Sequence, residues 1–503
     1  TEFNSLRKNW AYRVDQLTTT HPIATEMVDL DAVRTNFDGI SYAKGASVLQ
    51  QLVAHVGRDN FIKGLRLYFA KHAFGNTTLK DLIDQLEAAS GRDLTPWVST
   101  WLRTAGVNTL RPVIEVSGDT YASISIQQEV PTMPLGSTEL RPHRLHVGLF
   151  DIVGDKLTRR TSVELDVEGA LTEVKALASA KVADLVLIND KDQTYAKLRF
   201  DHRSIATMKS HLGSLDDSLA RGLIWASLWD SCRDGELSAT DYVTIALNAL
   251  KSESDISIVS ATLMQIDTAI WAYANPTKRD ALRAHVGQSV EALLDASAAG
   301  SDHQMAFARA FANFAFTPAH YDRIKAILDG SINGLVIDAE IRWYIFICGV
   351  KRGLFGPADI QAESKKDETA HGKQYTARAN ASMPSKDAKL KAFNSITTDN
   401  LSNTIHSYTC LGFNENIHHD VLADFVDPYF DSMLKVWETK GYEIAETTAT
   451  LLFPTWVITP ETLAKTEHWL NVTGKDAAHS LRRAITEGRD AMARALKARS
   501  ADK

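Results

Sequence analysis

Residues 40–57, with the sequence ISYAKGASVLQQLVAHVG, carry the clearest helical pattern near the start of the chain. Apolar side chains recur there at three- and four-residue spacing, which is the spacing of one face of an α-helix. These side chains are Ala46, Leu49, Leu52, Val53 and Val56. Gly57 follows as a C-terminal cap, because glycine adopts without steric cost the left-handed conformation that ends many helices. We therefore predict a helix that begins at Tyr42 and ends before Gly57.

Helical patterns surround this segment and extend over residues 1–106. A following helix carries its bulky side chains on one side, at Phe61, Leu65, Tyr68 and Phe69. Thr78 precedes another helical run and is a good N-cap, because its hydroxyl accepts a backbone N–H bond that the first turn leaves open. Pro96 suits the first turn of a further helix, which carries Trp97 and Trp101. Residues 1–106 are therefore predicted to be helical.

Between residues 107 and 200 the hydrophobic period changes to two. The clearest run places Val163, Leu165 and Val167 in alternation with polar residues, and similar runs begin at Ala122 and Leu145. Glycines separate these runs, at Gly118, Gly136 and Gly154. Short alternating strands divided by glycine turns indicate a small antiparallel β-sandwich.

Residues 201–503 return to a helical period. The clearest stripe has spacings of four, three, four and three residues, at Val259, Leu263, Ile266, Ile270 and Tyr273. Comparable stripes continue to the end of the chain and are joined by short loops, which is typical of a stacked, HEAT-like helical superhelix. The charged segment 363–373 is expected to be a mobile loop between helices. The fold class is therefore a multidomain, mainly α protein with a central β-sandwich.

Composition excludes several classes of protein. With 503 residues, 44% of them hydrophobic and 23% charged, the chain is not largely disordered. Its formal net charge of -7, without any Lys/Arg block, argues against nucleic-acid binding. No run of about 18 apolar residues occurs, so no membrane span is predicted. Residues 1–4 have neither an initiator methionine nor the form of a signal peptide, and we expect the chain to begin within a longer sequence.

The three cysteines are odd in number and widely spread, at Cys232, Cys348 and Cys410. This pattern provides neither a disulfide framework nor a Cys-x-x-Cys metal clamp. We expect them to be buried, reduced thiols of a cytoplasmic protein, because free cysteine is among the most buried residue types.

A catalytic metal site is the next feature to look for. Zinc peptidases of the gluzincin type need His-Glu-x-x-His on one helix, with a further glutamate as third ligand. The chain has 16 histidines but no His-Glu pair. His418 and His419 are adjacent, so on a helix they point about 100° apart and cannot chelate one ion without other partners. Glycine-rich phosphate loops and a Gly-x-Ser-x-Gly elbow are also absent. These motifs alone leave a helical scaffold with a β insert.

Several segments, taken in order, change this interpretation. The stretch 40–49, together with Thr20-His21-Pro22-Ile23 upstream, resembles closely the aminopeptidase N-type gluzincin family, which includes the alanyl and puromycin-sensitive aminopeptidases. The resemblance also includes the segments 10–12, 74–78, 91–94, 97–106, 189–190, 195–197, 228–230, 412–413 and 451–454. It therefore covers essentially the whole chain, and its most specific part is Tyr-x-Lys-Gly-Ala after Thr-His-Pro.

The resemblance implies a zinc metallopeptidase that removes N-terminal residues from peptides, with a role in peptide catabolism. In the family, a zinc-bound water attacks the scissile carbonyl, and the metal and one tyrosine hydroxyl hold the oxyanion. The matching position here is Tyr42. At a helix start the dipole favours nearby negative charge, and a phenol donates a hydrogen bond while neutral. The alternative is a half-buried tyrosine that only anchors the helix.

The neighbouring motif residues receive no chemistry. Gly45 is expected to permit close helix packing, and Lys44 to be a surface or ion-pairing residue. His21 belongs to a segment that is structural in the family, so it is left out of any metal site.

The family's zinc ligands, its general base and the acidic residues for the substrate amino group would all lie upstream of residue 1. The resemblance thus implies that residues 1–106 are the incomplete C-terminal helical part of a thermolysin-like peptidase domain. A β-sandwich (107–200) and a large α-helical domain (201–503) would follow. We expect zinc in the parent protein, and neither cofactor nor activity in this chain alone. The expected partners are peptide substrates and the missing N-terminal, zinc-binding segment, with no nucleic acid and no membrane.

Two alternatives remain at this point. The first is a non-enzymatic helical scaffold that binds peptides or a protein partner, and the presence of His-Glu-x-x-His upstream of Thr1 would distinguish the enzyme from it. The second is an epoxide hydrolase-type relative with the same zinc fold. Those relatives end in a compact helical domain, whereas this chain continues with a sandwich and about 300 further residues.

Overall fold

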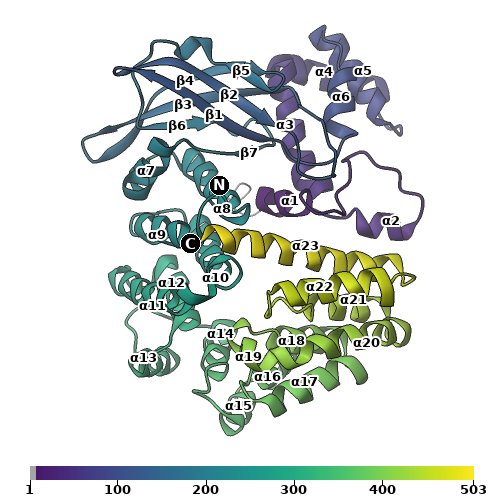
Figure 1. The fold of residues 1–503 in the computed structure, drawn as a ribbon, viewed down its shortest axis with the longest axis vertical. Helices are drawn as coiled ribbons and strands as arrows, with labels where there is room; N and C mark the ends of the chain where they lie inside the picture. Colours follow the sequence, from purple (N-terminus) through teal and green to yellow (C-terminus); the bar gives the residue numbers. More distant parts are fainter. Residues whose placement is uncertain (1–6) are drawn as a thin grey trace. The chain divides into compact units, whose positions relative to one another are not determined.

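A computed structural model describes residues 7–503 of the chain (Figure 1). The expectation drawn from residues 1–4 and the first six residues of the predicted segment 1–106 lie outside the described part. The described residues form two compact units, one of residues 7–231 and 248–261 and the other of residues 232–247 and 262–503.

The first unit begins with six helices, the purple and dark-blue part of Figure 1. They are α1 (Asn9–Val14), α2 (Leu30–Thr35), α3 (Gly45–Val56), α4 (Arg58–His72), α5 (Leu79–Ser90) and α6 (Thr95–Leu102). Three local predictions are confirmed. Gly57 ends α3 with a positive φ of 83°. Thr78 forms a capping box with Asp81 at the start of α5. Pro96 lies in the first turn of α6, whose Trp97 and Trp101 are buried.

The predicted face of α3 is partly wrong. A π-helical turn, η2 (Ile40–Lys44), precedes α3. Ala46 and Leu49 are exposed, while Val48, Leu52 and Val56 form the buried face. A π-turn adds one residue to the helix, which rotates the side chains on either side of it relative to one another. A sequence period measured across such a turn therefore assigns part of the face incorrectly.

Two small sheets follow the helices in the same unit. Their strands are β1 (Thr109–Ser117), β2 (Thr120–Glu129), β3 (His143–Val153), β4 (Lys156–Val167), β5 (Leu171–Glu173), β6 (Leu185–Ile188) and β7 (Lys197–Leu198). One sheet has the order β5-β2-β1-β7 and the other β4-β3-β6. The alternating runs that begin at Ala122 and Leu145, and the run around Val163, all lie in strands, as predicted. All named pairings are antiparallel except that β1 and β7 pair in parallel.

Both sheets contribute to one hydrophobic core. It contains Leu110, Ile124 and Ile126 from the first sheet and Leu145, Val147 and Ile188 from the second. The side chain of Gln51 on α3 joins the sheet region to the helices: its Nε2 donates to the carbonyl of Arg144 on β3 (3.0 Å), and its Oε1 accepts from the same residue's N–H (2.9 Å). The helical and strand parts of the first unit are thus hydrogen-bonded to each other.

The rest of the chain is helical. α7 (His202–His211) belongs to the first unit, while α8 (Ser218–Arg233), α9 (Ala239–Leu250) and α10 (Ile256–Thr268) each contribute residues to both units. All five residues of the predicted stripe from Val259 to Tyr273 are buried, in α10 and the π-helix η5 (Ala269–Tyr273) that continues it. A mainly helical chain with a small strand region is therefore confirmed.

Thirteen further helices of the second unit are α11 (Arg279–Ala296), α12 (Asp302–Phe314), α13 (Pro318–Leu328), α14 (Ala339–Val350), α15 (Pro357–Ser364), α16 (Ala370–Ala381), α17 (Lys386–Thr398), α18 (Asn403–Phe413), α19 (His419–Leu422), α20 (Val426–Thr439), α21 (Tyr442–Leu451), α22 (Pro460–His468) and α23 (His479–Ala501). After α23, the carboxylate of Asp502 accepts from the N–H groups of Thr240 (3.1 Å) and Asn275 (2.9 Å). The last residues are thus fixed to the first ones of the same unit.

The predicted loop 363–373 is partly wrong, because only residues 365–369 connect two helices. Glu363 lies in the last turn of α15 and is 5% exposed, and α16 begins at Ala370. The Nη2 of Arg342 donates to the Glu363 carboxylate over 3.0 Å. A charged residue can be buried when a cation pairs with it, and a partner 21 residues away does not show in the local composition.

All three cysteines are buried and unpaired, as predicted. None of the helices formed by residues 7–503 has both the length and the apolar character needed to cross a membrane.

Candidate functional site

Tyr42 is the third residue of the η2 turn, immediately before α3. Its side chain is exposed, with 52% of the residue surface accessible. Its ring contacts Phe37 edge to face, with 4.9 Å between ring centroids and 71° between ring planes. Within residues 7–503 its hydroxyl has no hydrogen-bond partner, so it can donate to a ligand. The predicted position at a helix start is confirmed, and its chemical role is not tested by this geometry.

Asp38 holds the start of the turn that carries Tyr42. Its Oδ1 accepts from the backbone N–H groups of Ile40 (2.9 Å) and Ser41 (3.2 Å). Its backbone carbonyl accepts from the N–H of Tyr42 (3.2 Å). N–H groups in the first turn of a helix have no partner within the helix, so a carboxylate that accepts two of them satisfies a local need.

His21 lies against the other oxygen of the same carboxylate. Its Nε2 is 3.0 Å from Oδ2 of Asp38, and its Nδ1 is 2.8 Å from the carbonyl of Pro22. Both side chains are only 12% exposed. The Thr-His-Pro segment thus contacts the turn that carries Tyr42, and the expectation that His21 is structural agrees with these contacts.

Lys44 is buried and ion-paired, not on the surface. Its Nζ lies 2.8 Å from Oδ2 of Asp15 and donates to the carbonyl of Gly106 over 3.1 Å. The other oxygen of Asp15 accepts from the N–H of Gly106 (2.8 Å) and from Thr20 Oγ1 (2.7 Å). Burial lowers the pKa of Lys44 to about 8, against the opposing effect of the Asp15 carboxylate.

The close packing expected at Gly45 occurs at Gly39 instead. A methyl group on Gly39 would lie 2.9 Å from the backbone of Ala11, whereas one on Gly45 would meet nothing nearer than 3.9 Å. Asp38 and Gly39 are thus two structural residues of the site that the sequence reasoning missed. For Asp38 the sequence contained a signal, because an aspartate just before a helical run is a good N-cap.

Exposed apolar side chains concentrate near this site. Half of the large hydrophobic side chains that are exposed among the described residues lie between residues 27 and 79. Those around α2 are called here the α2 face and consist of Met27, Val28, Leu30, Val33 and Phe37. Five large apolar side chains exposed within one short segment favour an interface there.

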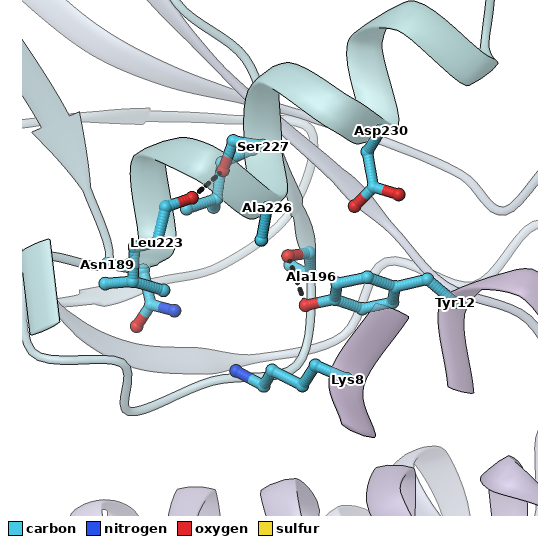
Figure 2. A pocket seen from close by; sticks show the side chains of 9 residues that line it. Lys8, Tyr12, Asn189, Ala196, Leu223, Ala226, Ser227 and Asp230 are labelled. Carbon is cyan, nitrogen blue, oxygen red and sulfur yellow. Dashed lines mark hydrogen bonds between the residues drawn. The ribbon is translucent and has the colours of Figure 1, made fainter. Parts of the chain in front are cut away.

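A separate small cavity lies in the first unit, between α1, α8 and the residues before and in β7 (Figure 2). Tyr12 donates its hydroxyl to the carbonyl of Ala196 at its edge (2.9 Å), and Lys8 donates to the carbonyl of Thr194 (3.0 Å). Its volume is about 10 Å³, which suits about one water molecule. It is too small for a peptide and does not include Tyr42.

Metal ligands do not come together in the described part of the chain. Within residues 7–503 no three His, Cys, Asp or Glu side chains are arranged to hold a metal ion. His418, considered from the sequence, has its Nε2 2.6 Å from the carbonyl of Lys351, and burial lowers its pKa to about 4. It is a buried structural histidine in the second unit.

The sequence matches two protein families. Residues 185–494 match the ERAP1-like C-terminal domain, and residues 2–101 match the peptidase family M1 domain. Aminopeptidase N of Streptomyces lividans is 44% identical over 510 aligned residues, which cover 100% of this chain and 59% of that protein. Tricorn protease-interacting factor F2 of Thermoplasma volcanium is 26% identical over 49% of the chain, and this match covers 29% of that relative.

A shorter match involves the mitochondrial aminopeptidase 2 of Saccharomyces cerevisiae, which is 37% identical over 118 residues, or 24% of this chain and 12% of that relative. The chain thus spans 59% of the length of the relative that matches it throughout. The family resemblance carried by the Tyr42 segment is confirmed. The chain belongs to the aminopeptidase N-type proteins of peptidase family M1, with an ERAP1-like C-terminal domain over residues 185–494.

Proposed function

We propose that this chain is part of a zinc-dependent aminopeptidase that releases N-terminal amino acids from peptides, with Tyr42 as the residue that stabilises the oxyanion. The observation that carries the proposal is the 44% identity to an aminopeptidase N along the whole of this chain. The exposed hydroxyl of Tyr42, on a turn held by Asp38, supports the assignment of the residue.

The proposed role of Tyr42 is to donate a hydrogen bond to the carbonyl oxygen of the scissile peptide as negative charge develops there. A donor already in position costs little reorganisation when the charge appears. Tyr42 also lies near the N-terminal end of the η2–α3 helix, where the helix dipole favours a nearby negative charge. The hydroxyl therefore stabilises the transition state more than the bound substrate.

The residues of this chain do not fit the zinc ion of the family. The sequence contains no His-Glu pair, and no metal site forms among residues 7–503. In the proposal, residues outside these 503 hold the zinc of the parent protein. This chain alone would bind no stoichiometric zinc and would be inactive.

The proposal includes an intramolecular partner, the zinc-binding remainder of the M1 domain, which would cover the α2 face. Elemental analysis of the dialysed chain tests whether it binds zinc by itself, and about one zinc per chain would contradict the proposal.

We further propose three domains, 1–106, 107–200 and 201–503, of which the second is a β-sandwich and the third a HEAT-like superhelix. The parent would act on peptides in the cytoplasm, without a nucleic-acid or membrane partner.

Tyr42→Phe in the full-length protein tests the catalytic assignment. The substitution keeps the ring and its contact with Phe37 and removes only the hydroxyl. Loss of one oxyanion donor typically costs about 10²–10³ in rate, so kcat should fall by about this factor while KM changes far less. The measurement is steady-state hydrolysis of an amino-acid arylamide at matched zinc content.

Tyr68→Phe is the matched control, because it also removes one phenol hydroxyl, whose partner is Thr77 Oγ1 at 2.6 Å. It should leave kcat close to that of the unmodified enzyme. A Tyr42→Phe enzyme within about threefold of wild type, below the loss expected for a donor, would show that Tyr42 is a packing residue.

A further inference from the structure

We infer, on the basis of the role proposed for Tyr42, that Asp38 and His21 are positioning residues that fix the Tyr42 hydroxyl through the backbone of the η2 turn. Neither side chain is assigned contact with substrate. Their effect on the reaction would pass entirely through Tyr42.

Packing does not fix the Tyr42 side chain. Among the described residues its ring contact is with Phe37, which is itself 68% exposed, and its hydroxyl has no partner. A side chain with so few contacts takes its direction mainly from its backbone. The position of the hydroxyl therefore depends on how firmly the turn is held.

One carboxylate, that of Asp38, holds the η2 turn. Asp38 uses Oδ1 for the N–H groups of Ile40 and Ser41 and its backbone carbonyl for the N–H of Tyr42. The hydroxyl of Ser41 donates to the carbonyl of Asn36 over 2.6 Å. The residues on either side of Tyr42 are thus fixed from both ends, because the N–H of Gly45 also closes the π-turn on the carbonyl of Ile40.

His21 in turn fixes the carboxylate of Asp38. Its ring lies between Oδ2 of Asp38 and the carbonyl of Pro22, so it cannot rotate without losing a contact. The segment that carries it is anchored at both ends: Thr20 Oγ1 donates to Asp15 (2.7 Å), and the N–H of Ala24 donates to the carbonyl of Leu102 (2.8 Å). The Thr-His-Pro segment thereby connects the turn to a rigid part of the unit.

The kinetic test is a double-mutant cycle in the full-length enzyme with the arylamide substrate. Asp38→Ala and His21→Ala should each lower kcat, by up to about 10²-fold, with less than threefold change in KM, because misplacing a catalytic group by about 1 Å costs this much. In a Tyr42→Phe background the same substitutions should cost almost nothing further, since the group they position is gone. Asp38→Asn should restore most of kcat, because its amide can still accept from Ile40 and donate to a neutral His21.

Asp201→Ala is the matched control. Asp201 Oδ1 also accepts from two backbone N–H groups, those of Arg203 (3.0 Å) and Ser204 (3.1 Å), but at the start of α7. Asp201→Ala should leave kcat unchanged.

Amide hydrogen exchange measures the turn directly in this chain. In Asp38→Ala, exchange should accelerate at Ile40 and Ser41 and remain unchanged at Leu52 of α3.

The outcomes separate the inference from the proposed function. If Tyr42→Phe keeps wild-type kcat, the catalytic assignment falls and the positioning role falls with it. If Tyr42→Phe is slow but Asp38→Ala costs the same factor in both backgrounds, only the positioning role is overturned. Unchanged exchange at Ile40 and Ser41 would also overturn it, whereas faster exchange together with a kcat loss that requires Tyr42 supports it.

Discussion

Each of the two compact units contains a lysine with no exposed surface, and the two lysines are satisfied in different ways. Lys44, two residues after Tyr42, pairs with the carboxylate of Asp15. Among the described residues, Lys389 donates to the backbone carbonyls of Ala381 (2.8 Å), Gly412 (2.9 Å) and Phe413 (3.0 Å). These carbonyls belong to the ends of α16 and α18, where helix dipoles favour a positive charge.

The difference shows what holds each region together. At Lys44 a formal counter-charge ties the η2 turn to segments that lie far away in the sequence. At Lys389 a single ammonium group joins two helix ends, and its hydrogen-bond acceptors within residues 7–503 are carbonyls rather than a carboxylate. Burial lowers the pKa of Lys44 to about 8 and that of Lys389 to about 7. Burial is the largest cause of both shifts, and a carboxylate opposes it at each lysine, Asp15 at Lys44 and Glu415 at Lys389.

The largest effect should follow from Lys44→Met. It leaves the Asp15 carboxylate buried with hydrogen-bond donors but without its cation. Breaking a buried ion pair from one side typically costs about 3–5 kcal/mol, so the free energy of unfolding should fall by about this amount. Urea denaturation of the chain at pH 7 measures it.

Asp15→Leu in the Lys44→Met background is the control for this prediction, because it removes the unpaired charge as well. The double variant should recover part of the lost stability. A single Lys44→Met variant that loses less than about 1 kcal/mol, a value typical of exposed pairs, would contradict a strong buried pair.

Lys389→Met should reveal itself through pH. In the unfolded chain a lysine keeps its proton up to a pKa of about 10.4, whereas folded Lys389 releases it above about 7. Between these values the unfolded state binds more protons, so the free energy of unfolding of the wild type rises with pH. The free energy of unfolding of the wild type should therefore rise relative to that of Lys389→Met between pH 7 and 9. The rise should be at most about 1.4 kcal/mol per pH unit.

The comparison with Lys44 gives this prediction its control. The corresponding window for Lys44 opens only above its pKa of about 8. Urea denaturation at pH 7, 8 and 9 measures the free energy of unfolding of the wild type minus that of each variant. This difference should rise from pH 7 for Lys389→Met and only from pH 8 for Lys44→Met. A difference that stays constant with pH for Lys389→Met would mean that Lys389 remains protonated in the folded state.

Gly412→Ala should have an intermediate effect. Gly412 supplies one of the carbonyls that Lys389 uses, and it allows α18 to approach α16 closely. A methyl group there would lie 2.2 Å from the carbonyl oxygen of Arg378 and 2.9 Å from the Cβ of Ala381. Overpacking of this kind costs typically about 1–3 kcal/mol, which urea denaturation would measure. An unchanged free energy of unfolding would mean that the two helices separate without cost.

Local patterns in the sequence were sufficient for the helices, the main strands and the position of Tyr42. Thr78, Pro96 and Gly57 act within a few residues of themselves, so their roles could be read locally. The alternation around Val163 worked for the same reason, because side chains on a strand alternate between its two faces.

The errors arose where a residue depends on a distant partner. Lys44 forms the ion pair expected as one alternative, but its burial depends on Asp15 and Gly106, which lie 29 and 62 residues away. Glu363 is buried because of Arg342. His21 contacts Asp38, which lies 17 residues further along the chain, and no local pattern indicates this contact. The π-turn shifted the apparent face of α3, since one inserted residue changes the phase of a helical period.

The smallest effect, and the opposite sign, should follow from Gly45→Ala. Both Gly412 and Gly45 lie in segments that resemble the family, but Gly45 has φ -54° and ψ -48°, which any residue adopts in a helix. A methyl group would lie 3.9 Å from the carbonyl oxygen of Ile40 and 4.0 Å from Ile23, at ordinary contact distance. Alanine in a helix is more stable than glycine by about 0.5–1 kcal/mol, so urea denaturation of this chain should show a gain of this size.

Gly39→Ala, six residues earlier, should instead be destabilising, because its methyl group would lie 2.9 Å from the backbone of Ala11. A loss of stability for Gly45→Ala in this chain would restore the original prediction that Gly45 permits close packing. A gain in the chain together with a loss of kcat in the full-length protein would show that a segment outside these 503 residues approaches Gly45.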